Sequence, residues 1–153
     1  MSIKESRLAR SNADASVGRS LQEPEPHRFD TDLAQGLLAA ADSISRSVLS
    51  LEAYLMDNPA RHALPGISAF SSSVDEALRL LALALREGQP LIVFPDLQLA
   101  MHKLEHAGNL SKHNEARADL RFVIAEARRI IRNINTMKQL LATKKVEEEK
   151  VVR

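Results

Sequence analysis

The segment His102-Lys103-Leu104-Glu105-His106 has the residue types and spacing of a zinc-binding helix. Histidines four residues apart share one helix face, so both can reach a single Zn²⁺ ion, and the glutamate beside them can act as a base. A catalytic zinc needs a third protein ligand, however, and the remaining histidines lie at no ligand spacing: His27, His62 and His113. We therefore interpret His102 and His106 as surface histidines near a helix end and as weak metal candidates. A zinc-dependent hydrolase that uses His102, Glu105 and His106 is kept as a remote alternative.

The rest of the sequence offers no second arrangement of catalytic residues. It lacks cysteine, which excludes disulfides, thiolate metal sites and cysteine nucleophiles. It contains neither a G-x-S-x-G motif nor a glycine-rich phosphate-binding loop. We interpret Ser71, Ser72 and Ser73, followed by Asp75 and Glu76, as the cap of a helix, because acidic groups are stabilised at the positive end of the helix dipole. The sequence therefore predicts a protein that is not an enzyme and needs no cofactor.

A basic segment lies near the C-terminus. Residues 111–145 carry nine Lys and Arg against three Asp and Glu, whereas residues 1–110 carry ten against fourteen. These cations would contact phosphates by charge alone, since the segment lacks the interleaved aromatic side chains that stack on bases and any DNA-reading motif. Glu115 and Asp119 can also pair with arginines on their own helix. We interpret the basic residues as a solvated helix face and expect no nucleic-acid partner; docking on the acidic first part of the chain is the alternative.

Length and composition favour one all-α domain. The chain has 153 residues, enough for one hydrophobic core, and 44% of them are hydrophobic while only 3% are aromatic. Five glycines and six prolines are too few for the many turns of a β-sandwich. No stretch reaches the roughly 18–20 apolar residues of a membrane span, and the N-terminus lacks the apolar core of a secretory signal. We predict an up-and-down bundle of four to five helices with a long C-terminal helix.

Apolar residues at intervals of three and four predict helices over residues 3–22, 31–57, 68–86 and 111–143, with a short helix between Pro95 and Gly108. The stripe of the second helix consists of Leu33, Leu37, Ala40, Ile44, Val48, Leu51 and Leu55. The third helix has the broadest apolar face, and we expect it to be central. Residues 91–94 are expected to form a buried connector. We therefore predict that residues 1–110 form a helical core and that residues 111–145 form a basic amphipathic helix packed on this core. Residues 146–153 are predicted to be a frayed tail.

Two apolar faces are predicted to bind neighbouring helices, in the same or another subunit. The first helix has too few large apolar residues to be stable alone, and the last helix carries a continuous apolar stripe. The predicted partner-binding residues are Leu8, Val17, Leu21, Ile124, Ile131 and Ile134. These surfaces favour an assembly role, including a possible homo-oligomer.

The segment from Arg7 to Leu21, RLARSNADASVGRSL, resembles a stretch of the fusaric acid resistance and aromatic acid exporter (FUSC) family. There, similar residues follow the second transmembrane block and open a cytosolic helical domain. The likeness covers residues 4–107 and continues through Glu23-Pro24, Gly36–Ala40, Leu49–Ala53 and the helix from Val74 to Leu85. The helix over residues 111–143 has no counterpart, and no membrane block is present. The resemblance supplies no catalytic residues.

The resemblance implies a soluble cytosolic module of an inner-membrane exporter of aromatic or weak organic acids. Its partner would be a membrane-embedded exporter subunit or domain. The module would lie at the cytoplasmic face of the inner membrane and would have an assembly or regulatory role. The chain would be a piece of a longer protein or a separate product that cannot transport alone. The alternative is a free-standing cytoplasmic adaptor or scaffold that self-associates.

Overall fold

The computed structural model describes residues 11–13, 15–16, 18–19, 31–57, 66–88, 93–109 and 114–151. The bundle contains the helices α2 (Thr31–Asp57), α3 (Ile67–Glu87), α4 (Leu97–Asn109) and α5 (Asn114–Val151). The described residues between 11 and 19 are helical too, whereas the rest of the predicted first helix lies outside the described residues. No strand occurs in the part of the chain that the structure describes. The predicted all-α helical bundle with a long C-terminal helix is confirmed.

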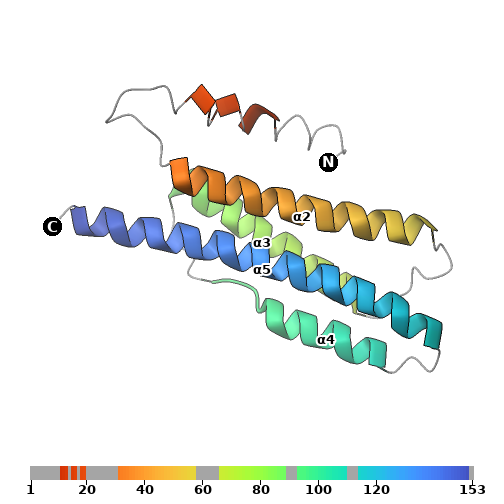
Figure 1. The fold of residues 1–153 in the computed structure, drawn as a ribbon. Coiled ribbons are helices and arrows are strands. Elements are labelled where there is room, and N and C mark those ends of the chain that lie inside the picture. Colours follow the sequence, from red (N-terminus) through yellow and green to blue (C-terminus); the bar gives the residue numbers. More distant parts are fainter. Residues whose placement is uncertain are drawn as a thin grey trace.

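Helix α5 is the centre of the bundle. Successive helices from α2 to α5 run in alternating directions, and α2 lies alongside α5 (Figure 1). α5 packs against each of α2, α3 and α4, and its pairing with α2 is the most extensive. The expectation that the third helix is central is therefore wrong. The physical reason is that α5 buries two adjoining rows of side chains and can therefore pack against helices on more than one side. The buried residues of these rows are Val123, Ala127, Ile130, Ile131, Ile134 and Met137.

The core stripe of α2 differs from the predicted one in its second half. The spacing of four and three that begins at Leu33 leads to positions 47 and 54, and these are the positions that face the core. Ser47 is fully buried, whereas Val48 is 47% exposed. Tyr54, in place of Leu55, packs against the core, and its ring centroid lies 4.8 Å from that of Phe122 on α5. The prediction is wrong because it chose the more apolar residues, Val48 and Leu55. The helical repeat places their neighbours Ser47 and Tyr54 on the core face.

The helix boundaries follow backbone and capping chemistry. α3 begins at Ile67 after Gly66, which has a positive φ of 86°, and its N-cap makes no side-chain hydrogen bond. The predicted serine cap is therefore wrong: the serines lie inside the helix, where the Ser73 hydroxyl donates to the Ala69 carbonyl. At the other end, Gly88 has a φ of 64° and terminates α3, as predicted. Asp96 opens α4 by accepting a hydrogen bond from the Leu99 amide at 2.9 Å.

Two further segments differ from expectation. Val93, in the predicted buried connector, is 77% exposed. Phe94 packs against the core, and Lys138 Nζ lies 4.6 Å from the centroid of its ring. The other two residues of the connector, 91 and 92, lie outside the described residues. α5 continues to Val151, so the helix extends beyond the predicted end at residue 143 and includes residues 146–151. Neither glycine nor proline occurs after Thr143 to end the helix.

All four helices contribute to one hydrophobic core. Its fully buried side chains include Leu81 of α3, Leu104 of α4 and Ile134 of α5. Gly36 on α2 allows a close approach to α5, because a β-carbon there would lie 2.9 Å from Leu140 Cδ1. Across the described ranges, no helix combines the length and apolar character that a membrane span requires.

Candidate functional site: the groove between α4 and α5

An open groove of about 550 Å³ lies between α4 and α5. Each helix contributes four residues at steps of three, one and three, the spacing that places side chains on one helix face. The lining residues are Gln98, Met101, His102 and Glu105 of α4 with Arg128, Ile131, Arg132 and Asn135 of α5. Met101 and Ile131 are buried and form the apolar floor, while polar side chains form the rim. The groove is thus a polar surface feature built on the hydrophobic core.

One ion pair joins the two walls of the groove. Arg128 Nη2 and Nε donate to Glu105 Oε1 at 2.7 and 3.2 Å. Both side chains keep solvent contact, with 60% of Arg128 and 30% of Glu105 exposed. The pair therefore contributes about 0.2–1 kcal/mol to stability. The carboxylate that the sequence motif would assign as a catalytic base contacts an arginine across the groove instead.

The two histidines of the motif meet on the exposed side of α4, as their spacing predicts. His102 Nε2 and His106 Nε2 are 3.1 Å apart, and their ring centroids are 4.3 Å apart. Both side chains are exposed. Within the described ranges, no group of three or more His, Cys, Asp or Glu residues is placed to hold a metal ion. The hydrolase that uses His102, Glu105 and His106 would need a third ligand from elsewhere, and it stays a prediction.

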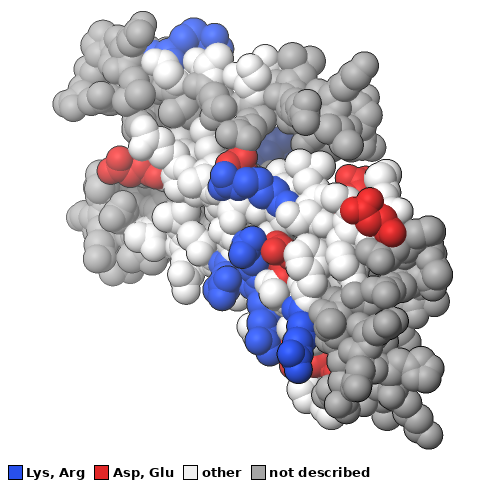
Figure 2. Space-filling model, turned by 45° about the vertical axis from the view of Figure 1, so that its right-hand side comes forward, with Lys and Arg blue, Asp and Glu red and all other residues white. Residues whose placement is uncertain are grey.

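The basic face of α5 is exposed, in keeping with the predicted solvated surface. Lys and Arg side chains gather in a column on the visible face of the molecule, with acidic groups between them (Figure 2). Arg128 pairs with Glu105, and Arg129 pairs with Glu126 at 3.1 Å. Arg132 makes no ion pair with another described residue. The side chains of Glu115 and Asp119, which were expected to pair with arginines, lie outside the described residues.

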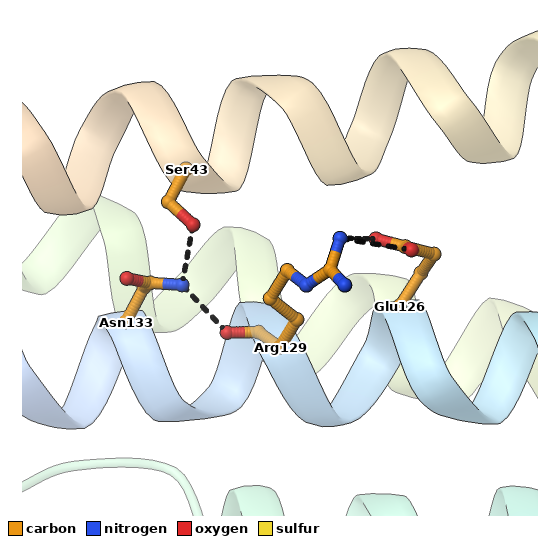
Figure 3. Close-up of polar contacts among 4 residues, drawn as sticks. All are labelled: Ser43, Glu126, Arg129 and Asn133. Carbon is orange, nitrogen blue, oxygen red and sulfur yellow. Dashed lines mark hydrogen bonds and ion pairs between the residues drawn. The ribbon is translucent and has the colours of Figure 1, made fainter.

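A polar seam joins α2 to α5 and could not be recognised from the sequence. Asn133 Nδ2 donates to Ser43 Oγ at 2.9 Å and to the Arg129 carbonyl at 2.8 Å. Arg129 in turn holds Glu126, which is only 6% exposed (Figure 3). A buried carboxylate is costly unless it is paired, and this arginine supplies the pairing. One hydrogen bond of the seam, from Asn133 to Ser43, crosses between the two longest helices, and its other contacts lie within α5.

Three of the predicted partner-binding residues lie in the described part of the chain, and all three face its core. Ile131 and Ile134 are buried in the core of this chain, and Ile124 is partly buried and packed against it. For these three residues the neighbouring helices belong to the same chain, because α2, α3 and α4 pack against α5. Binding to a helix of another subunit stays a prediction. The other three predicted residues lie outside the described residues: Leu8, Val17 and Leu21.

Three large apolar side chains are exposed on α2 instead. Val48, Leu49 and Met56 are 47%, 42% and 74% exposed. At 3.6 residues per turn they fall within an arc of about 100° on the helix surface. We call these three residues the outer patch of α2. The apolar spacing of α2 did not reveal this patch, because Val48 fitted the predicted core stripe.

One ion pair away from the groove shifts the pKa of both partners. On α3, Arg79 Nη2 and Nε donate to the two carboxylate oxygens of Glu76 at 2.7 and 3.1 Å. Hydrogen bonding to Arg79 lowers the pKa of Glu76 below its ordinary value, and the same bonds raise the pKa of Arg79. Because both groups are exposed, the pair is a local feature of the α3 surface.

The fold and the groove together define the chain as an all-α bundle with polar interhelical contacts. Comparisons with protein-family models, with curated proteins and with solved structures found no match to this chain.

Proposed function

We propose that this chain is a non-catalytic helical module that binds other protein helices in an assembly or regulatory role. The observation that carries the proposal is the outer patch of α2. Its three large apolar side chains lie on one side of a helix whose other side already packs against α5. Exposed apolar residues that cluster on one face favour a protein–protein contact.

The polar groups of the bundle support the same proposal. Glu105 and Arg128 join α4 to α5, and Asn133 joins α5 to Ser43 of α2. These side chains hold helices together, so their arrangement favours a rigid scaffold that presents an apolar surface. A rigid helix face binds with a smaller loss of conformational entropy than a flexible one.

The resemblance to the FUSC family suggests the partner. We propose that it is the membrane-embedded subunit or domain of an exporter of aromatic or weak organic acids, and that the module works at the cytoplasmic face of the inner membrane. The matching segment between Leu49 and Ala53 lies within the part of α2 that carries the outer patch. The alternative partner is a second copy of the same chain, which would make the protein a cytoplasmic self-associating adaptor.

A pull-down from detergent-solubilised membranes tests the proposal, with the full chain as bait. The test variant is Leu49→Asp/Met56→Asp, which places two charges on the outer patch. A matched control, Ala39→Asp/Ala125→Asp, adds the same charges at exposed positions elsewhere. We expect a membrane-embedded transport protein to be retained by the wild type and the control, and released by the patch variant.

Size-exclusion chromatography with light scattering on the same proteins decides between the two partners. Self-association that the patch variant abolishes, without a captured membrane protein, would favour the adaptor. A helix-binding role for this surface would be refuted by two results together: the wild type is monomeric, and the wild type and the patch variant retain the same proteins in the pull-down.

A further inference from the structure

We infer that His102 and His106 form a two-histidine binding site for a divalent transition-metal ion on the exposed side of α4, where His102 also lines the groove. This inference rests on the geometry of the two imidazoles and is independent of the proposed function. It assigns binding of a metal by two protein ligands, with water in the remaining positions, and it does not assign hydrolysis.

The distance between the two ring nitrogens suits a shared ion. Zinc bound by imidazole has Zn–N bonds of about 2.0–2.1 Å, which set two ligand atoms about 3.3–3.4 Å apart at a tetrahedral angle and about 2.8–3.0 Å apart at a right angle. The observed separation of His102 Nε2 and His106 Nε2 is 3.1 Å, between these two values. The helix backbone thus already holds both donors at the separation that a metal would impose, so binding requires little rearrangement.

The pair is accessible, and no other described side chain forms a hydrogen bond with its Nε2 atoms. Both histidines are exposed, so an ion can reach them without opening the core. Glu105, the nearest acidic residue in sequence, is held by Arg128 across the groove, and the charges of that pair offset each other. The site therefore offers two imidazole nitrogens as ligands, and no carboxylate among the described residues joins them as a third.

The donor set defines the chemical class of the ion. Imidazole nitrogen suits Cu²⁺, Ni²⁺ and Zn²⁺, whereas Mg²⁺ and Ca²⁺ prefer oxygen ligands. Cu²⁺ should bind most tightly, in line with the general order of affinities for divalent metals. An ion bound at positions four residues apart would also link two turns of α4 and stabilise the folded state, because the unfolded chain does not hold the two rings together.

The proposal is tested by isothermal titration of the full chain with CuCl₂, NiCl₂, ZnCl₂ and MgCl₂ at neutral pH. The test variants are His102→Ala and His106→Ala, and the control is His62→Ala, which removes a histidine far from α4 in the sequence. Both variants change exposed residues, and circular dichroism verifies that each remains helical. We expect one Cu²⁺, Ni²⁺ or Zn²⁺ per chain in the wild type and the control, and no binding of Mg²⁺.

Loss of either ligand should weaken binding by at least about tenfold, since even the loss of a supporting residue outside the coordination shell has an effect of that order. A saturating transition metal should raise the Tm of the wild type by about 5 °C and leave that of the variants unchanged. The inference is overturned if the wild type binds none of these ions, or if both variants bind them as tightly as the wild type. The imidazoles would then form only a hydrogen bond with each other.

Discussion

Replacing Ile134 by alanine tests whether the apolar face of α5 belongs to the core of this chain. Ile134 is 0% exposed and lies on the helix that packs against α2, α3 and α4. Truncation of a buried isoleucine costs about 2–5 kcal/mol, and the larger values arise where the surroundings cannot collapse into the cavity. Because three helices fix the position of α5, we expect a loss of about 3–4 kcal/mol in the free energy of unfolding. The Tm should fall by about 10 °C.

Leu49→Ala on α2 is the matched control, because its side chain is 42% exposed and belongs to the outer patch. We expect this variant to lose less than about 1 kcal/mol, as surface substitutions generally do. Urea unfolding followed by circular dichroism measures both variants, and an unchanged m-value shows that the unfolded states are comparable. The reasoning is refuted if Ile134→Ala costs no more than Leu49→Ala, since Ile134 would then not be part of the core.

Three further predictions concern single polar contacts. Asp96→Ala should lower the stability of the protein by about 1 kcal/mol in urea unfolding, because the first turn of α4 loses its cap; an unchanged midpoint would contradict this role. In a double-mutant cycle, Ser43→Ala and Asn133→Ala should show a coupling energy of about 0.5–1.5 kcal/mol, and additive effects would mean that the bond does not form in solution. The Glu76 carboxyl should titrate in NMR below its ordinary pKa of 4.5. Because the pKa of Glu76 is lowered in the folded state, the pair with Arg79 stabilises the fold above pH 4.5, and this stabilisation is lost as the pH falls through the folded-state pKa. Arg79→Gln should restore the ordinary pKa of Glu76.

The fold class was predictable because the helical repeat of leucine and alanine extends over many turns. Leu33, Leu37, Ala40 and Ile44 are buried as their spacing predicts. The end of α3 at Gly88 was equally clear, because glycine adopts the left-handed conformation without strain. These features depend on local chemistry that a single sequence contains.

The relative positions of the helices could not be predicted in the same way. Which helix is central depends on how much of each apolar stripe its neighbours cover, and stripes of similar composition do not reveal this. Ser47 and Val48 show the difficulty, because the packing of α2 against α5 buries the serine and exposes the valine. The polar seam through Asn133 depends on a contact between residues 90 positions apart in the sequence.

The candidate site was predictable only in part. The spacing of His102 and His106 correctly placed both rings on one exposed helix face. The engagement of Glu105 by Arg128 could not be foreseen, because it depends on the approach of α5 to α4. The outer patch of α2 could not be recognised because Val48 was predicted to lie in the core stripe, whereas it is 47% exposed beside Leu49 and Met56.

The antiparallel pairing of α2 with α5 is the central structural claim, and cysteine cross-linking tests it most directly. The chain contains no cysteine, so an introduced pair reacts without competition. Ser43 Oγ and Asn133 Nδ2 are 2.9 Å apart, which brings thiols at these positions within reach of a short thiol-specific cross-linker. Ser43→Cys/Asn133→Cys should cross-link rapidly within one chain, while Leu49→Cys/Asn133→Cys should not. Equal rates for the two pairs, or cross-links formed only between chains, would contradict the arrangement of helices described above.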